Sequence, residues 1–273
     1  MDLSKIKLVV SDLDGTLLNS NHEVSALFFE LFETLRKQNI IFVAASGRPY
    51  YSIIKKLKSI KDDIIIVAEN GGIVVKQNKL LLSTPLATRN LLDIEVLINS
   101  NNQIHPIYCT QFKAYFKVYS EDKVKLLSEY YPNFEVVKSI EDIKEDIIKI
   151  ALYHAEDSEK YMYPIFKQLE SEYEVKISGK HFLDISDNMA NKGYAISMIQ
   201  NRYSISPGET MIFGDYNNDL EMLKLATYSF AMENAHKNVL KTANYKTKSN
   251  NDFGVEIILE KLIEAKKINY QKQ

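Results

Sequence analysis

Apolar runs alternate with helical repeats along the first 72 residues of the chain. Three short runs are predominantly apolar: Ile6–Val10, Ile40–Ala45 and Ile64–Ala68. Between the first two, apolar residues recur every three or four positions: Leu27, Phe28, Leu31, Phe32 and Leu35. This spacing predicts an amphipathic helix, and Ile53, Ile54 and Leu57 indicate a second one before the third run. Continuous apolar strands separated by helices are typical of a parallel sheet that is buried on both faces.

The pattern changes between residues 84 and 185. Polar and apolar residues alternate in Gln103–Cys109 and Lys113–Ser120, which predicts an antiparallel sheet with one exposed face. Helices are expected near Leu91–Ile98, Glu121–Tyr130 and Ser158–Tyr173. Further strands are expected near Ile147–His154, Val175–Ser178 and Phe182–Ile185. These elements would form a separate α+β unit.

The strand–helix pattern then resumes. Helices are predicted at Lys192–Tyr203, Asp219–Ala226 and Val255–Lys267, and strands at Thr210–Phe213 and Tyr228–Met232. The predicted fold class is therefore α/β, with a Rossmann-like parallel sheet formed by residues 1–83 and 186–273. Residues 84–185 are expected to be an inserted α+β domain.

Composition and charge exclude several classes of protein. The 34 basic and 36 acidic residues leave a net charge of −2, whereas binders of nucleic acid or anionic membranes carry a basic surplus. No apolar run approaches the roughly 18 to 20 residues that a membrane helix needs. The single cysteine, Cys109, excludes an internal disulfide and a Cys-rich metal site. The N-terminus leads directly into a strand, so we expect no signal peptide and a cytoplasmic location.

Polar residues lie within two positions of the end of four of the predicted parallel strands. They are Asp12, Ser46, Asn70 and Asp215. In parallel α/β sheets, ligands bind beyond the carboxyl ends of the strands, so these residues are expected at one functional edge.

Asp12 and Asp14 are the first candidates for chemistry at that edge. Residues two apart in extended backbone point the same way, so two carboxylates would converge. Like charges in such proximity need a cation, and oxygen ligands suit Mg²⁺. The alternative is a plain strand-terminating turn, in which both side chains bond backbone N–H groups and Gly15 adopts a positive φ.

A second acidic cluster spans Gly214–Asp219. Asp215 would share the edge with Asp12 and complete a metal site. Asn218 with Glu221 three residues later also matches a helix capping box, which would leave Asp215 unexplained.

Two further segments carry positive or hydrogen-bonding groups. Ser46-Gly47-Arg48 precedes a helix expected to start at Pro49, and free N–H groups at a helix start bind anions. Arg48 is one of only four arginines, but a solvated cation at a helix start is the alternative. Lys192 opens a helix, where an exposed lysine is the default interpretation. The histidines show no metal-ligand spacing and are expected on the surface or in packing: His22, His105, His154, His181 and His236.

Taken together, the motifs resemble those of the haloacid dehalogenase superfamily of phosphotransferases. The matching segments occur in the family's order: Asp12–Leu18, Ser46–Arg48, Lys192–Gly193 and Gly214–Asp219. The long insertion resembles the αβ cap of the Cof-type subgroup, as do Glu69–Gly72 and Ala231–Ala235. Glu233, where relatives often carry glycine, and the polar stretch Asp187–Asn191 depart from the family pattern.

The resemblance implies a Mg²⁺-dependent phosphomonoesterase that works through an aspartyl-phosphate. Asp12 would be the nucleophile and Asp14 the general acid and base. The implied metal ligands are Asp12, the backbone carbonyl of Asp14, Asp215 and, in or behind the shell, Asp219. The implied substrate-binding residues are Ser46, Gly47, Arg48, Lys192 and Asn218. The inserted domain would close over the site as a cap.

Asp14 favours phosphoryl transfer over dehalogenation, because a departing halide needs no proton. The expected substrate is a small phosphate ester, such as a sugar phosphate or a phosphorylated cofactor like FMN or pyridoxal phosphate. A phosphomutase is a close alternative, and a non-catalytic phospho-aspartate signalling module is a more distant one. We expect a monomer or homodimer that binds neither nucleic acid nor membranes.

Overall fold

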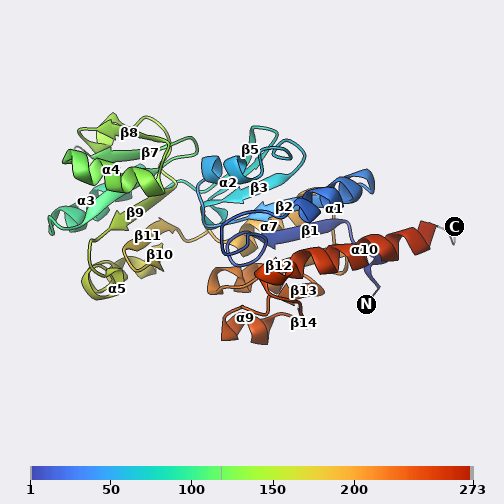
Figure 1. The fold of residues 1–273 in the computed structure, drawn as a ribbon. Coiled ribbons are helices and arrows are strands. Elements are labelled where there is room, and N and C mark those ends of the chain that lie inside the picture. Colours follow the sequence, from blue (N-terminus) through green and yellow to red (C-terminus); the bar gives the residue numbers. More distant parts are fainter. Residues whose placement is uncertain (1, 118, 271–273) are drawn as a thin grey trace. The chain divides into compact units, whose positions relative to one another are not determined.

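The computed structural model describes residues 2–117 and 119–270 of the chain (Figure 1). Two compact units are present, and each is described by itself. The first unit comprises Met1–Arg48, Ser52–Leu82 and Asn191–Gln273, and the second comprises Pro49–Tyr51 and Ser83–Ala190. Each contains its own sheet.

The sheet of the first unit has eight strands in the order β14-β13-β12-β1-β2-β3-β4-β5. Their bounds are β1 Leu8–Asp12, β2 Ile41–Ala45, β3 Ile65–Ala68, β4 Ile73–Lys76, β5 Lys79–Ser83, β12 Thr210–Gly214, β13 Tyr228–Ala231 and β14 Tyr245–Lys246. The strands from β14 through β3 are parallel, and β4 runs antiparallel to β3. The parallel part confirms the predicted α/β fold class.

The helices of this unit are α1 Ala26–Lys37, α2 Tyr50–Lys56 from Ser52 onward, α7 Lys192–Tyr203, α8 Leu220–Leu223, α9 Lys237–Thr242 and α10 Gly254–Tyr270. Helix α1 shows why apolar residues at every third or fourth position form a helix here. The Ser25 hydroxyl caps its start by accepting from the Phe28 N–H at 3.0 Å. Phe28 and Phe32 then pack on Phe42 of β2, with ring centroids 5.1 and 6.0 Å apart. The apolar stripe of the helix therefore contributes to the core beside β2.

The second unit has a six-stranded sheet in the order β10-β11-β9-β6-β7-β8. Its strands are β6 His105–Cys109, β7 Ala114–Lys117, β8 Phe134–Val137, β9 Lys149–Tyr153, β10 Tyr173–Gly179 and β11 Phe182–Asp187. Its helices are α3 Thr88–Asn99, α4 Glu121–Tyr130, α5 Ser158–Tyr161 and α6 Tyr163–Phe166. The strand pairs are antiparallel except for β7 and β8, which are parallel.

The expected half-exposed face of this sheet is wrong for its central strands. One hydrophobic cluster joins Tyr115 of β7 to Ile94 of α3, and a second joins Phe116, the next residue, to Leu127 of α4. Successive residues of a strand point to opposite faces, so helices cover both faces at this position. The sequence alternates because tyrosines and a lysine lie among apolar residues, but the Tyr115 ring is buried. Residue 118 of the predicted run lies outside the described residues.

The single helix expected over Ser158–Tyr173 is also wrong. Helix α5 ends at Tyr161, α6 starts at Tyr163, and a 3₁₀ segment follows at Lys167–Ser171. Pro164 lacks an N–H group, and its ring would clash with the carbonyl of Lys160, so a continuous α-helix is excluded.

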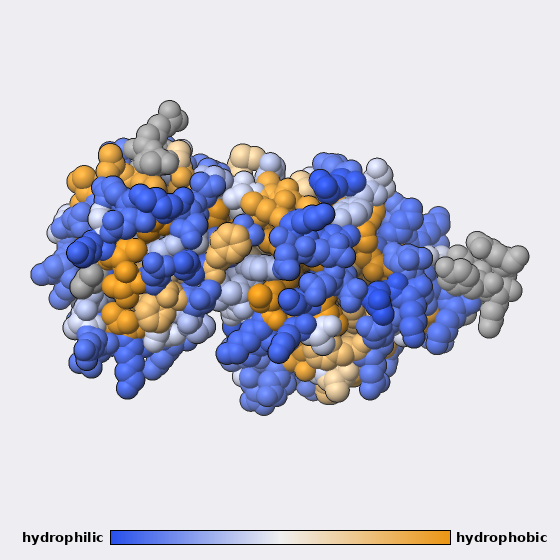
Figure 2. Space-filling view, turned by 90° about the horizontal axis from the view of Figure 1, so that it is seen from above, coloured by the Kyte–Doolittle hydropathy of each residue, from blue (hydrophilic) through white to orange (hydrophobic). Residues whose placement is uncertain are grey.

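The face shown in Figure 2 is mainly hydrophilic, with several groups of hydrophobic residues. Across the described part of the chain, none of the helices combines the length and the apolar character needed to cross a membrane.

Candidate active site

Three aspartates meet at the carboxyl edge of the first sheet. Asp12 ends β1, and Asp215 follows the adjacent strand β12, so the pairing of these strands brings the two residues together. Asp219 lies one helical turn beyond Asp215. Carboxylate oxygens of Asp12, Asp215 and Asp219 all lie within 4.8 Å of one another.

Lys192 lies among these carboxylates. Its side chain is fully buried, and its Nζ donates to Asp12 Oδ1 at 2.5 Å and to Asp219 Oδ1 at 2.6 Å. Burial works against the charged ammonium, but Asp12 and Asp219 outweigh it and hold the pKa of Lys192 above its ordinary value. The default interpretation of Lys192 as an exposed helix lysine is therefore wrong.

Asp219 fixes the loop after β12. Its Oδ2 accepts hydrogen bonds from the backbone N–H groups of Asp215 at 2.9 Å and Tyr216 at 3.1 Å, while its Oδ1 binds Lys192. The expected capping pair of Asn218 and Glu221 is wrong, because Asp219 occupies the cap position before α8. Both carboxylate oxygens of Asp219 are thus engaged in hydrogen bonds, one with Lys192 and the other with the loop that carries Asp215.

Asp215 is held from the loop after β1. The Thr16 hydroxyl donates to Asp215 Oδ1 at 2.9 Å. Gly15 has a φ of +76°, and a Cβ at this position would lie 2.3 Å from Asp215 Oδ2. Any side chain at residue 15 would both strain the backbone and displace the Asp215 carboxylate. The turn predicted around Gly15 thus also makes room for the acidic cluster.

The acidic cluster is short of positive charge. Burial first, and then the negative charge of Asp219, raise the pKa of Asp215 to about 6. Burial also raises the pKa of Asp12 well above its ordinary value, with Lys192 only partly offsetting it. When ionised, the three carboxylates and one ammonium carry a net charge of −2, which one divalent cation balances. Buried carboxylate oxygens with raised pKa values fit a hard cation such as Mg²⁺.

Asp14 lies in different surroundings. Arg48 donates two hydrogen bonds of 2.6 Å to its carboxylate, from Nε to Oδ2 and from Nη2 to Oδ1. Partial burial pushes the pKa of Asp14 upward, but these bonds and the Arg48 charge outweigh it, so the pKa lies below its ordinary value. His22 Nδ1 is 3.3 Å from Asp14 Oδ1. No motif or spacing in the sequence pointed to His22 as a neighbour of Asp14.

The remaining predicted residues lie around the end of β2. Ser46 is buried, and its Oγ accepts from the Arg48 N–H at 3.1 Å. Helix α2 starts at Tyr50, one residue after the expected Pro49. Asn218 Nδ2 donates to Asn70 Oδ1 at 2.9 Å, and Asn70 also lies against Gly47. Asn70 follows β3, so the strand-end rule selected it, although no role was predicted for it.

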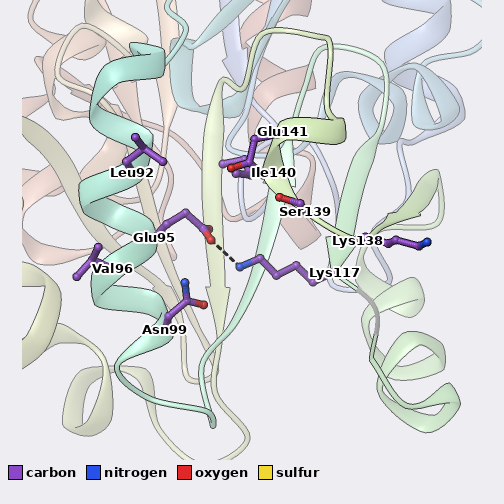
Figure 3. A pocket seen from close by; sticks show the side chains of 9 residues that line it. All are labelled: Leu92, Glu95, Val96, Asn99, Lys117, Lys138, Ser139, Ile140 and Glu141. Carbon is purple, nitrogen blue, oxygen red and sulfur yellow. Dashed lines mark hydrogen bonds and ion pairs between the residues drawn. The ribbon is translucent and has the colours of Figure 1, made fainter.

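The second unit contains a hollow of its own, with a volume of about 410 Å³ (Figure 3). Leu92, Glu95, Val96 and Asn99 of α3 line one side of it. Across it, Lys117 Nζ lies 2.6 Å from Glu95 Oε2, as the dashed line in Figure 3 marks. The Glu95 and Lys117 charges in this hollow are paired with each other.

Comparisons with known proteins match this chain over most of its length. Residues 9–259 match the family model of the haloacid dehalogenase-like hydrolases. The 5-amino-6-(5-phospho-D-ribitylamino)uracil phosphatase YbjI of Escherichia coli is 29% identical, covering 94% of this chain and 96% of that protein. The phosphatase YwtE of Bacillus subtilis, named for the same substrate, is 26% identical, with 94% and 98% covered. The crystal structure of SMU.1108c from Streptococcus mutans is 31% identical, with a TM-score of 0.83 and 95% and 99% covered.

Proposed function

The chain belongs to the haloacid dehalogenase-like hydrolases, and on that basis we propose that it is a Mg²⁺-dependent phosphomonoesterase. Its substrate would be a small phosphorylated metabolite, hydrolysed through an aspartyl-phosphate. The observation that carries the proposal is the pairing of Asp12 with buried Lys192 inside a cluster of three aspartates. An aspartate in such a site is suited to attack a phosphate ester, whose own negative charges would otherwise repel it.

In the first step, a carboxylate oxygen of Asp12 forms a bond to phosphorus. The bond between phosphorus and the ester oxygen breaks on the opposite side, and Asp14 donates a proton to that oxygen as the alcohol departs. Lys192 holds the Asp12 carboxylate in place through its 2.5 Å hydrogen bond.

In the second step, water attacks the phosphorus of the aspartyl-phosphate. Asp14, now ionised, accepts a proton from that water, and the bond between phosphorus and the Asp12 oxygen breaks. Phosphate leaves, Asp12 is again a carboxylate, and Asp14 is again protonated. Arg48 must therefore release Asp14 when substrate binds, because its two hydrogen bonds favour the ionised form.

Asp12, Asp215 and the backbone carbonyl of Asp14 would hold Mg²⁺, with Asp219 positioning the loop that carries Asp215. When bound, the cation supplies positive charge that offsets repulsion between the carboxylates and the phosphate. Ser46, the Gly47 amide, Lys192 and Asn218 would bind the phosphoryl oxygens. We propose that Arg48 also binds the substrate, once it has released Asp14.

The names of two relatives support a proposal for the substrate class. YbjI and YwtE are named phosphatases of 5-amino-6-(5-phospho-D-ribitylamino)uracil, a phosphate ester on a polyhydroxylated chain. We propose this compound, sugar phosphates and FMN as the first substrates to test. Residues 84–185 are proposed to act as a cap that excludes water in the first step and selects the alcohol.

The test is phosphate release from a panel of these esters, with Mg²⁺ and after exhaustive treatment with EDTA. We expect turnover only with the divalent cation, and none from Asp12→Asn. Full activity in the chelated enzyme would contradict the proposed dependence on Mg²⁺. Conversion of a sugar phosphate to its isomer without free phosphate would identify a mutase instead.

A further inference from the structure

Residues Glu69–Gly72 form an unusual turn directly after β3. Glu69, Asn70 and Gly71 have φ values of 50°, 55° and 104°, so three consecutive residues have left-handed or otherwise positive φ. Only glycine adopts such angles freely, and asparagine tolerates the left-handed region better than most residues. Strained backbone of this kind persists only where its surroundings hold it, and it concentrates at functional sites.

The backbone of this turn binds the Ser46–Arg48 loop. The Asn70 N–H donates to the Ser46 carbonyl at 3.0 Å, and the Glu69 N–H donates to the Arg48 carbonyl at 3.1 Å. The turn therefore fixes the segment that carries the Ser46 hydroxyl and the Gly47 amide.

The same turn lies against the start of α7. A Cβ on Gly71 would lie 2.3 Å from the Asn191 carbonyl oxygen and 3.0 Å from the Lys192 nitrogen. The absence of a side chain thus lets the turn approach the backbone that carries Lys192.

The Asn70 side chain makes the third connection. Its Oδ1 accepts from Asn218 Nδ2 at 2.9 Å, and a Cβ on Gly47 would lie 2.9 Å from the same oxygen. An amide nitrogen carries two hydrogens, so Asn218 keeps one for another acceptor while Asn70 fixes the rotation of its amide.

We propose that Asn70 is a positioning residue for phosphoryl binding, which orients the Asn218 amide beside Gly47 and ties together the segments that hold Ser46, Lys192 and Asn218. The inference rests on the proposed phosphatase function, because those segments are assigned to the phosphoryl group of its substrate. All the contacts involved lie within the first unit.

Asn70→Gly tests this role, because glycine keeps the left-handed backbone and removes only the amide. The matched control is Asn39→Gly. Asn39 is an exposed asparagine with a φ of 58°, and it precedes β2, whereas the site lies beyond the other end of that strand. Neither substitution introduces backbone strain, so both variants should fold.

We expect Asn70→Gly to raise the KM for p-nitrophenyl phosphate roughly three- to tenfold, the size of one hydrogen bond, with a smaller change in kcat. In Asn70→Gly, the protection that inorganic phosphate gives against thermal unfolding should weaken by a similar factor. Asn39→Gly should match the parent enzyme in both measurements.

A double-mutant cycle with Asn218→Ala separates positioning from a general structural effect. If Asn70 acts through Asn218, adding Asn70→Gly to Asn218→Ala should raise KM by less than about twofold more. Fully additive effects, or an Asn70→Gly enzyme equal to Asn39→Gly, would overturn the positioning role while leaving the phosphatase function standing. Absence of phosphate release by the parent enzyme on every ester would overturn the function, and this inference with it.

Discussion

Asp12 and Asp14 are two positions apart in the chain, yet the structure gives their carboxylates opposite electrostatic surroundings. Burial and neighbouring carboxylates raise the pKa of Asp12, whereas Arg48 holds that of Asp14 below its ordinary value. Carboxylates whose pKa values are pushed apart commonly take different roles in one reaction. In the proposed mechanism the nucleophile must be ionised and the acid must carry a proton. Asp12 would therefore need added positive charge when substrate binds, and Asp14 would need to lose its hydrogen bonds to Arg48.

The first prediction at this scale concerns Arg48. In Arg48→Ala the pKa of Asp14 should rise, because the two hydrogen bonds and the positive charge that stabilise its ionised form are gone. The proton of the acid then persists to higher pH, so the alkaline limb of kcat/KM for an alkyl phosphate should move upward in pH. A pH–rate profile measures this, with Arg36→Ala, an exposed arginine paired with Glu33, as the control. An unmoved alkaline limb would show that Arg48 does not set the proton affinity of Asp14.

The second concerns the proton that Asp14 is proposed to donate. Asp14→Asn should slow phosphorylation by an alkyl ester about 10² to 10⁴-fold, but phosphorylation by p-nitrophenyl phosphate much less, because that leaving group departs without a proton. The base for the second step is missing with either ester, so the phosphorylated enzyme should accumulate with the aryl one. Rapid quench and intact-mass measurement would detect it. Equal losses on both esters, without a trapped intermediate, would remove the acid–base role.

At the scale of elements, the sequence predicted correctly those helices whose start and end are determined by residues within the helix itself. Lys192–Tyr203 matches α7 and Glu121–Tyr130 matches α4 at both ends, because apolar spacing and end residues lie within the segment itself. The hairpin of β4 and β5 was not predicted: its turn at Gln77 and Asn78, with φ values of 49° and 59°, carries no glycine.

In the candidate site, too, some residues could be predicted from the sequence and others could not. The strand-end rule selected Asp12 and Asp215, because parallel strands place their carboxyl ends at one edge whatever the intervening sequence. The contact of Asn70 with Asn218 joins residues 148 positions apart and depends on two side-chain rotamers. Such a contact leaves no periodic or local trace, and neither does the approach of His22 to Asp14.

A prediction for the second unit concerns Glu95 of α3. One of its oxygens accepts from the buried Tyr108 hydroxyl and the other pairs with Lys117 at 2.6 Å. Burial raises the pKa of Tyr108, which keeps that hydroxyl protonated as a donor. Glu95→Ala leaves a buried hydroxyl and a mostly buried ammonium without their acceptor, so it should destabilise the fold by about 2–3 kcal/mol. Urea unfolding measures the loss, and Glu129→Ala on the exposed face of α4 is the control. A loss as small as that of Glu129→Ala would show that solvent replaces Glu95.

At the scale of the whole molecule, we expect the aspartate cluster to couple the stability of the fold to pH and to divalent cations. The three carboxylates come from two separate stretches of the chain, Asp12 before the second unit and Asp215 and Asp219 after it. Unfolding separates them and removes their mutual repulsion. A cation held by Asp12 and Asp215 would bind only the folded chain, and binding of this kind stabilises the fold.

The sign of the pH effect follows from Asp215. Its folded pKa is about 6, against 3.8 for the ordinary value, so between these limits the folded chain binds more protons than the unfolded one. Stability of the cation-free protein should therefore fall as pH rises from about 4 to about 6, through the contribution of this group.

Mg²⁺ competes with the proton on Asp215, so its stabilising effect should be small near pH 5 and fully developed near pH 8. At a free concentration about a hundred times Kd it would reach ~2.7 kcal/mol, or several degrees in Tm. Thermal unfolding with MgCl₂ and with EDTA at both pH values measures this difference. In Asp215→Asn the cation should give little stabilisation at either pH, because one carboxylate ligand is gone. An equal Mg²⁺ shift at both pH values, or an undiminished shift in Asp215→Asn, would show that the cation binds elsewhere and that the charge of the cluster is balanced by Lys192 and protons alone.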